Sequence, residues 1–169
     1  MRQINRESPT GADLALLMAR HTQAMHADTP PESIHMMDAT ALDNPNIHFF
    51  VLRDQGQPVG MGAFKIMNAH EGEIKSMHIL HEVRGQGMAK QMLMHLIEHA
   101  KTAGLTRLSL ETGAQPSFEA ARLLYEKAGF FICMPFGAYV SDPNSVFMTK
   151  ALLTLAPTRT LSQKKPVAP

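Results

Sequence analysis

The sequence predicts an α/β fold built around one mixed sheet. Apolar runs with the two-residue alternation of strands alternate along the chain with segments whose apolar residues recur at helical spacing. The chain has 169 residues, of which 44% are hydrophobic, and it contains no internal repeat. That length and apolar content are typical of one domain with one sizeable core. We expect this domain to span residues 1–150. Residues 151–169, rich in Pro, Thr and Lys, have little to bury and are expected to form a flexible tail.

The N-terminal third predicts two helices. Ser8-Pro9-Thr10 precedes apolar residues that recur at helical spacing from Leu14 to Met25, which indicates a first helix. Pro30-Pro31-Glu32 restarts the chain, and Ile34, Met36 and Met37 indicate a short second helix. This helix is expected to end before the breaker Asp43-Asn44-Pro45-Asn46.

Three strands are expected next. The runs 47–53 and 59–66 flank the turn Asp54-Gln55-Gly56-Gln57-Pro58, which is a hairpin pattern. A further strand is expected over residues 73–80, with the sequence EIKSMHIL.

The segment Arg84-Gly85-Gln86-Gly87-Met88-Ala89 follows this strand and precedes a strongly amphipathic helix. Two glycines let the backbone turn sharply and leave no bulky side chain over it, so several amide N–H groups can point at one anion. The helix that follows adds the positive end of its dipole. The segment therefore predicts a phosphate cradle for a cofactor that contains a pyrophosphate.

The second half of the chain continues the alternation. The helix after the cradle has one apolar stripe and is expected to end at Gly104. A strand is then expected over residues 107–112, followed by a helix over 118–128 that Gly129 caps. Residues 131–136 and 145–150 are the last two strand candidates. The six positions of the apolar stripe are Met88, Met92, Leu93, Leu96, Ile97 and Ala100.

These motifs together resemble a known family. R-x-x-G-x-A after EIKSMHILHEV, with LLYEKAGF about forty residues later, is similar to the acetyl-CoA-binding core of the GNAT superfamily of N-acetyltransferases. The likeness covers roughly residues 46–150. HEGEIKSM, SLETG and DPNSVFMTK also resemble a bacterial subgroup of that superfamily. The resemblance implies a single GNAT-like domain with a mixed, mostly antiparallel central sheet, a splayed strand pair and flanking helices.

The resemblance also implies a cofactor site for acetyl-CoA as co-substrate. The cradle would hold the pyrophosphate through main-chain amides, and the main chain of the preceding strand would contact the pantetheine arm. Phe118 replaces the asparagine that many members place seven residues before a tyrosine, and Ser117 could take over part of that contact. The implied cofactor-binding residues are Met77, Ile79, Arg84, Gly85, Gln86, Gly87, Met88, Ala89 and Ser117.

Acetyl transfer to an amine also needs a base and an acid. An aliphatic amine with a pKa near 10.4 is nucleophilic in only about one molecule in two thousand at pH 7, so a nearby carboxylate that takes its proton helps. Glu73, at the start of the third strand, is the first candidate, and Glu111, at the end of a neighbouring strand, is the second. Tyr125 corresponds to the family's general acid, which protonates the departing thiolate. A mechanism that needs no base also stays open.

The expected reaction is direct transfer of an acetyl group, within a ternary complex, to a primary amine of a small metabolite or an amino-acid-like acceptor. A protein N-terminus or lysine stays open as the acceptor. The formal charge of +1 provides no global field that would attract nucleic acid or an anionic membrane. No apolar run approaches the ~20 residues that span a bilayer, so a cytoplasmic protein is expected. Whether the chain forms a homodimer is not readable from the sequence.

Other functions fit the sequence less well. His95-Leu96-Ile97-Glu98-His99 matches a zinc-protease pattern, but helical spacing turns Glu98 away from the histidines, so no metal site is expected. A dinucleotide-binding Rossmann unit would need a third glycine where Lys90 stands. A non-catalytic acyl-CoA sensor, with the cradle but no useful base, is the remaining alternative. Cys133, the only cysteine, is expected to be a buried thiol rather than a nucleophile.

Overall fold

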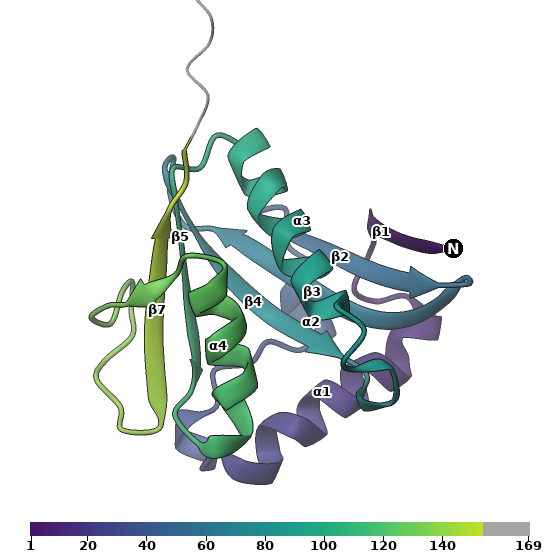
Figure 1. Cartoon of the computed structure of the whole chain (residues 1–169), viewed down its shortest axis with the longest axis horizontal. Helices are drawn as coiled ribbons and strands as arrows, with labels where there is room; N and C mark the ends of the chain where they lie inside the picture. Colours follow the sequence, from purple (N-terminus) through teal and green to yellow (C-terminus); the bar gives the residue numbers. More distant parts are fainter. Residues whose placement is uncertain (154–169) are drawn as a thin grey trace, which may run out of the picture.

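The computed structural model describes residues 1–153, which fold around one seven-stranded sheet with the strand order β1-β2-β3-β4-β5-β7-β6 (Figure 1). The strands are β1 (Arg2–Arg6), β2 (Ile47–Asp54), β3 (Gln57–Ile66), β4 (Glu71–Ile79), β5 (Arg107–Gly113), β6 (Phe131–Ile132) and β7 (Ser145–Ala151). The helices are α1 (Ala15–Asp28), α2 (Ala39–Leu42), α3 (Met88–Thr102) and α4 (Glu119–Lys127).

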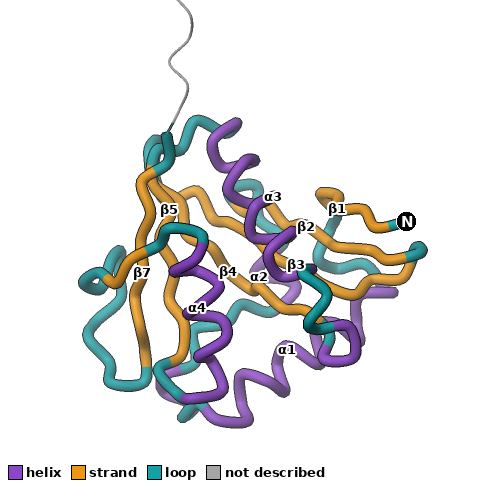
Figure 2. Tube along the Cα trace, viewed as in Figure 1, coloured by secondary structure: helices purple, strands orange, loops and turns teal. Residues whose placement is uncertain are grey.

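Helices cover the sheet on both faces (Figures 1 and 2). Side chains of α3 and α4 pack on one face, in a core that contains Phe50, Phe64 and Leu108. On the other face Leu17 of α1 and Leu42 of α2 pack in a second core. The sheet thus separates two layers of helices, and a ligand that contacts both layers must pass through it or around its edge.

The amphipathic pattern of α3 is confirmed. All six positions of the predicted apolar stripe are buried. Burying a large apolar side chain contributes ~1.5–3 kcal/mol, so this stripe fixes α3 against β3 and β4. The start of α3, with the predicted cradle before it, is therefore anchored relative to the sheet.

The pair β4 and β5 is the only parallel pair among the strands of residues 1–153, and it separates part-way along. Pairing runs from Glu71 opposite Arg107 to Ile74 opposite Leu110. Beyond this point β4 continues to Ile79 and β5 to Gly113 without pairing to each other. The sheet is therefore mixed, mostly antiparallel and splayed between its central strands, as the family resemblance of the sequence implies.

Three predictions near the N-terminus and the last strands need correction. Strand β1 was not predicted, because Arg2–Arg6 has only Ile4 as an apolar residue. The second helix was placed wrongly: Pro31–Ser33 forms a 3-10 turn, and the helix is Ala39–Leu42, whose N-cap Asp38 accepts a hydrogen bond from Ala41 N–H. Strand β6 covers only Phe131–Ile132 of the predicted 131–136.

The last strand of the sheet extends slightly past residue 150. Strand β7 includes Ala151, and Leu152 is buried in the core with α3 and α4. The remainder of the predicted tail, residues 154–169, lies outside the described residues.

Candidate active site

The cradle leaves its backbone amides open. Gly85 and Gly87 have φ angles of 78° and 77°, a left-handed conformation that suits glycine, and no atom lies within 4 Å of a Cβ built on either one. Gly87 is the N-cap of α3 and no side chain caps the helix. Within residues 1–153 the N–H groups of residues 85–90 donate to no other group. These donors and the helix dipole form a site that suits a phosphate group.

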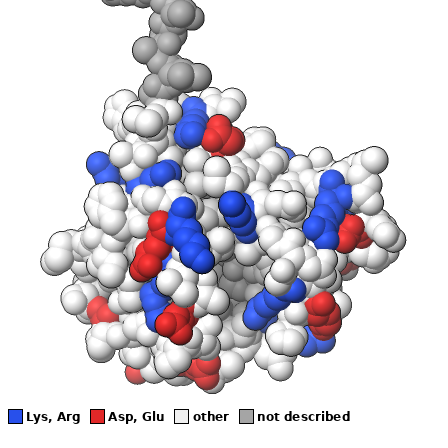
Figure 3. Space-filling view, viewed as in Figure 1, with Lys and Arg blue, Asp and Glu red and all other residues white. Residues whose placement is uncertain are grey.

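Basic side chains lie beside this site. Figure 3 shows the face that carries α3 and α4, where Lys and Arg side chains border a hollow between the two helices. Arg84 is exposed, and its Nε donates to the Ile79 carbonyl at 3.1 Å, so the side chain is fixed along the end of β4. Arg2 of β1 donates to the Gln86 side-chain oxygen at 2.6 Å. The unpredicted first strand therefore holds the outer side of the cradle.

Strand β4 presents unpaired backbone next to the cradle. Leu80 N–H donates to Val59 of β3, so by strand alternation the N–H groups of Ile79 and Met77 point away from β3, toward the gap. The register of β3 and β4 shifts beside Ser76, which has a φ of 54°. A non-glycine residue in this conformation costs ~1–2 kcal/mol. Such strain is common beside functional sites, and here it changes the direction of the following backbone groups.

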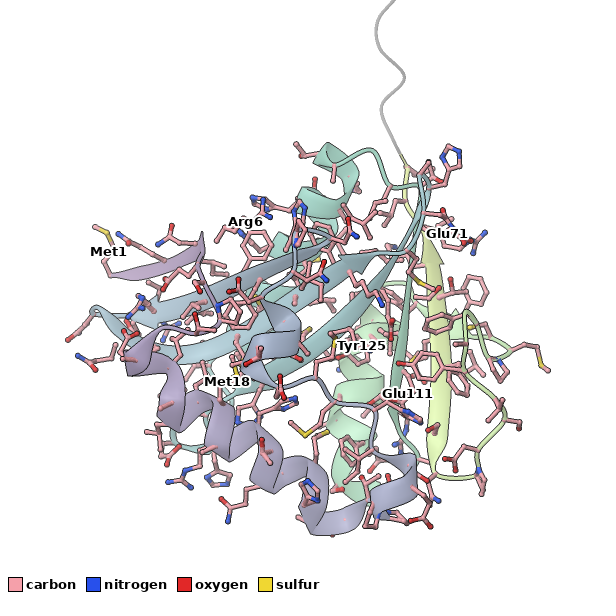
Figure 4. The ribbon with its side chains drawn as sticks, turned by 180° about the vertical axis from the view of Figure 1, so that it is seen from behind. Met1, Arg6, Met18, Glu71, Glu111 and Tyr125 are labelled. Carbon is pink, nitrogen blue, oxygen red and sulfur yellow. The ribbon has the colours of Figure 1, made fainter. Side chains whose placement is uncertain are left out.

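A cavity of about 120 Å³ lies in the gap between β4 and β5. Its walls come from α1, the segment after it, both diverging strands, α4 and Tyr139. Figure 4, seen from behind the view of Figure 1, shows Glu111 of β5 and Tyr125 of α4 beside this gap. The cavity connects the helix layer of α4 with that of α1. Among the predicted residues it brings together Glu73, Met77, Glu111 and Tyr125.

Glu73 is buried where β4 and β5 begin to separate, and one of its oxygens is already occupied. Glu73 Oε1 accepts hydrogen bonds from Lys75 Nζ at 2.8 Å and from the Tyr139 hydroxyl at 2.5 Å. Lys75 Nζ also donates to the Tyr139 oxygen at 3.1 Å. The three side chains form a closed hydrogen-bonded group, so fewer lone pairs of Glu73 are left for a ligand.

Glu111 has fewer partners. Its Oε1 accepts one hydrogen bond, at 2.7 Å, from the Ser145 hydroxyl of the neighbouring strand β7. Burial raises the pKa of the Glu111 carboxyl above its ordinary value, and the Ser145 hydrogen bond opposes that shift only in part. A carboxylate with a raised pKa takes up a proton more readily than an exposed one.

Tyr125 projects from α4 into the same cavity. The residue is 7% exposed, its ring packs on Phe130, and its hydroxyl makes no hydrogen bond within the described residues. Burial, with the nearby Glu111 charge second, raises the pKa of the phenol well above its ordinary value. Tyr125 therefore stays protonated at neutral pH and can donate its proton.

The remaining predicted residues lie elsewhere. Ser117 is exposed in the 3-10 turn Pro116–Phe118 and does not line the cavity. Phe118 does line it, and its ring lies 2.4 Å from the position that a Cβ on Gly113 would take. A phenyl ring therefore fills the end of the cavity near β5. Met88 is buried in the core, so it can offer a ligand only its backbone.

Sequence reasoning missed three residues that shape the cavity: His21, Lys75 and Tyr139. Tyr139 lies in the segment between β6 and β7, and no local pattern pairs it with Glu73. His21 lies within the first predicted helix, where its spacing does not show that it lines a cavity. Lys75 could have been found from its position two residues after Glu73, because alternate residues of a strand share one face.

Within residues 1–153 no three His, Cys, Asp or Glu side chains gather in a way that could hold a metal ion. Of the helices in that range, none has the length and apolar character to cross a bilayer.

Comparison with known proteins places this geometry in a family. Residues 14–130 match the family described as Acetyltransferase (GNAT) family. The chain is 46% identical over 143 residues to an uncharacterised N-acetyltransferase, YsnE, of Bacillus subtilis, which covers 85% of this chain and 95% of the relative. It is 38% identical over 151 residues to an IAA acetyltransferase of Azospirillum brasilense, covering 88% of this chain and 97% of the relative.

Solved structures show the same fold. A structure from Klebsiella pneumoniae is 30% identical, with a TM-score of 0.70, and covers 90% of this chain and 99% of that one. A GNAT acetyltransferase from Elizabethkingia anophelis, crystallised with acetyl-CoA bound, has a TM-score of 0.65 at 18% identity and covers 89% of this chain and 98% of that one.

Proposed function

Because the chain belongs to the GNAT family of acetyltransferases, and is therefore an acyltransferase, we propose that it transfers an acetyl group from acetyl-CoA directly to the primary amine of a small acceptor. The observation that carries this proposal is the cavity between β4 and β5. It brings carboxylates on the α1 side of the sheet within reach of a phenol on the α4 side.

The cofactor approaches from the α3 and α4 side. The pyrophosphate binds the open amides of residues 85–90, and the pantetheine arm runs along the unpaired edge of β4. The N–H groups of Met77 and Ile79 face the gap, so one of them can donate to the thioester oxygen. A donor aimed at the developing oxyanion contributes ~3 kcal/mol to lowering the barrier.

The acceptor approaches from the α1 side. Glu111 takes the ammonium proton, because its pKa is raised by burial and only Ser145 occupies its oxygens. The free amine then attacks the thioester carbon in the ternary complex, and the C–S bond breaks as the tetrahedral intermediate collapses. Tyr125 gives its proton to the departing thiolate. The proton that the nitrogen loses as the amide forms passes to the Tyr125 phenolate and restores the phenol. Glu73, paired with Lys75 and hydrogen-bonded by Tyr139, forms part of the wall on the acceptor side.

Thiol release from acetyl-CoA in the presence of an amine panel tests the proposal. We expect turnover that depends on the amine, and lines that intersect rather than run parallel in double-reciprocal plots, since a direct transfer needs both reactants bound. Parallel lines would instead indicate an acetylated enzyme. Tight acetyl-CoA binding without turnover of any amine would favour the acyl-CoA sensor.

A further inference from the structure

Three cavity-lining side chains, those of His21, Ser76 and Thr29, carry a buried polar atom without a hydrogen-bond partner within residues 1–153. His21 is 4% exposed and lines the cavity from α1, yet its Nδ1 is buried and bonds to nothing within the described residues. The Ser76 Oγ lines the same cavity from β4 and is also buried and unpartnered. Leaving a buried polar group unsatisfied costs ~1–3 kcal/mol, so two such atoms in one ligand cavity indicate a ligand that satisfies them.

His21 and Ser76 line the cavity from two neighbouring elements, α1 and β4. The ring of His21 packs on the ring of His78, with centroids 5.4 Å apart, and His78 lies two residues beyond Ser76 on β4. Thr29, which directly follows the last residue of α1, is the third of these residues. It lies eight residues after His21, or ~12 Å further in the direction of the helix, which is too far to bind the same small group.

This part of the cavity is polar but uncharged. Burial lowers the pKa of His21 to about 4, so its imidazole is neutral at pH 7. A neutral imidazole neither repels an ammonium group nor attracts an anion. Lys75, the cation that lines the cavity, is engaged by Glu73 and Tyr139. A free carboxylate placed here would lose its hydration without gaining a counter-charge.

Ser76 directly precedes Met77, whose N–H faces the gap where the thioester is proposed to bind. A group that bonds to Ser76 therefore lies close to the reacting amine. Building on the proposed function, we infer that His21 Nδ1 and Ser76 Oγ recognise an uncharged hydrogen-bonding group next to the acceptor's amine. The acceptor class is accordingly amino amides and amino alcohols rather than free amino acids.

The test compares L-leucinamide, L-leucinol, L-leucine and isoamylamine as acceptors. These amines differ in intrinsic basicity, so the informative quantity is how the ratio of kcat/KM for leucinamide to that for isoamylamine changes between enzyme variants. His21→Leu and Ser76→Ala each remove one hydrogen bond, and each should lower this ratio by roughly 3- to 10-fold. Leucine should be a poorer acceptor than leucinol.

Matched variants separate recognition from a general effect on the cavity. His21→Asn keeps a polar atom near the position of Nδ1 and should retain most of the preference. Thr29→Val makes the cavity less polar outside the subsite, and His26→Leu makes the same change as His21→Leu on the exposed face of α1. Neither should alter the ratio. Equal ratios in wild type, His21→Leu and Ser76→Ala would overturn the inference while leaving the acetyl transfer itself intact.

If no amine is turned over, the proposed function fails, and equilibrium binding decides the inference. Calorimetric titration of leucinamide into the protein saturated with CoA should then show binding that His21→Leu weakens. No binding, or equal binding to both proteins, would overturn it.

Discussion

The Tyr139 hydroxyl donates a 2.5 Å hydrogen bond to Glu73 Oε1 across 66 residues of sequence. Glu73 lies on β4, whereas Tyr139 comes from the segment that connects β6 and β7. The ring of Tyr139 packs against His35, Phe136 and Phe147, so the phenol has little freedom to turn away. This contact fixes the acidic part of the cavity and closes the acceptor side of the sheet.

Tyr139→Phe should therefore affect both stability and acceptor kinetics. The ring packing stays, and one hydrogen bond to a carboxylate is lost, which typically costs ~1.5–3 kcal/mol. We expect a lower free energy of unfolding in urea and a several-fold fall in kcat/KM for the amine. The affinity for acetyl-CoA in calorimetry should not change, because the cradle lies on the other side of the sheet. Wild-type stability together with wild-type kinetics would show that the contact has no role.

The cradle prediction is tested with Gly87→Glu. Space around Gly87 is open, so the side chain fits, but its charge would lie among the amides that are proposed to bind the pyrophosphate. We expect calorimetry to detect no acetyl-CoA binding by this variant. Its circular dichroism spectrum should match that of the folded wild type.

Gly104→Glu is the matched control for this variant. Gly104 has a φ of 86°, and no atom lies within 4 Å of a Cβ built on it. Replacing it with Glu therefore introduces the same backbone strain and the same negative charge, but at the opposite end of α3. Both variants should lose ~1 kcal/mol of stability. Only Gly87→Glu should lose the cofactor, and equal affinities in the two variants would contradict the cradle assignment.

Sequence reasoning found the elements whose pattern is local. The apolar stripe of α3 and the hairpin of β2 and β3 depend on spacing within one segment, and the structure has both. The order of strand, cradle, helix and tyrosine resembles the GNAT superfamily, and that resemblance implied the splayed sheet. Strand β1 was missed because it exists through pairing, with Ile4 opposite Leu52, and its own side chains are mostly polar and exposed.

The contacts of the candidate site could not be predicted in the same way. The sequence ranks Glu73 before Glu111 by its position on the strand, but it does not show that Lys75 and Tyr139 occupy Glu73 Oε1. Nor does it show that His21 faces the cavity with an unpartnered nitrogen. These properties arise when α1 and the segment before β7 fold over β4, so they depend on tertiary packing rather than on any local motif.

Tyr125→Phe tests the proposed general acid. The hydroxyl has no partner within the described residues, so its removal should leave the free energy of unfolding nearly unchanged, in contrast to Tyr139→Phe. The affinity for acetyl-CoA should stay, while kcat should fall by ~10²- to 10⁴-fold. Full turnover in this variant, measured as thiol release, would show that Tyr125 only packs in the core.

Glu111→Gln should lower activity and raise stability at the same time. The pKa of Glu111 is raised by burial, which means that its ionised form is less favourable in the folded than in the unfolded state. Its contribution to stability is therefore complete below the unfolded pKa of about 4.3 and is lost as the pH rises through the folded pKa. Glutamine stays neutral and can still accept the Ser145 hydrogen bond. Urea titrations should show a more stable variant at pH 7, and the difference should vanish below pH ~4.

Activity at neutral pH should change in the opposite direction, because glutamine cannot take the amine proton. We expect kcat/KM for the amine to fall by ~10²- to 10⁴-fold, with unchanged affinity for acetyl-CoA. Glu73→Gln is the matched control, since it removes the other cavity carboxylate, and its loss should be smaller. If Glu73→Gln loses the activity and Glu111→Gln keeps it, Glu73 is the base. If both variants keep it, ionisation of the amine alone sets the pH profile, and the enzyme works by holding two reactants together, which can supply ~7 kcal/mol or more.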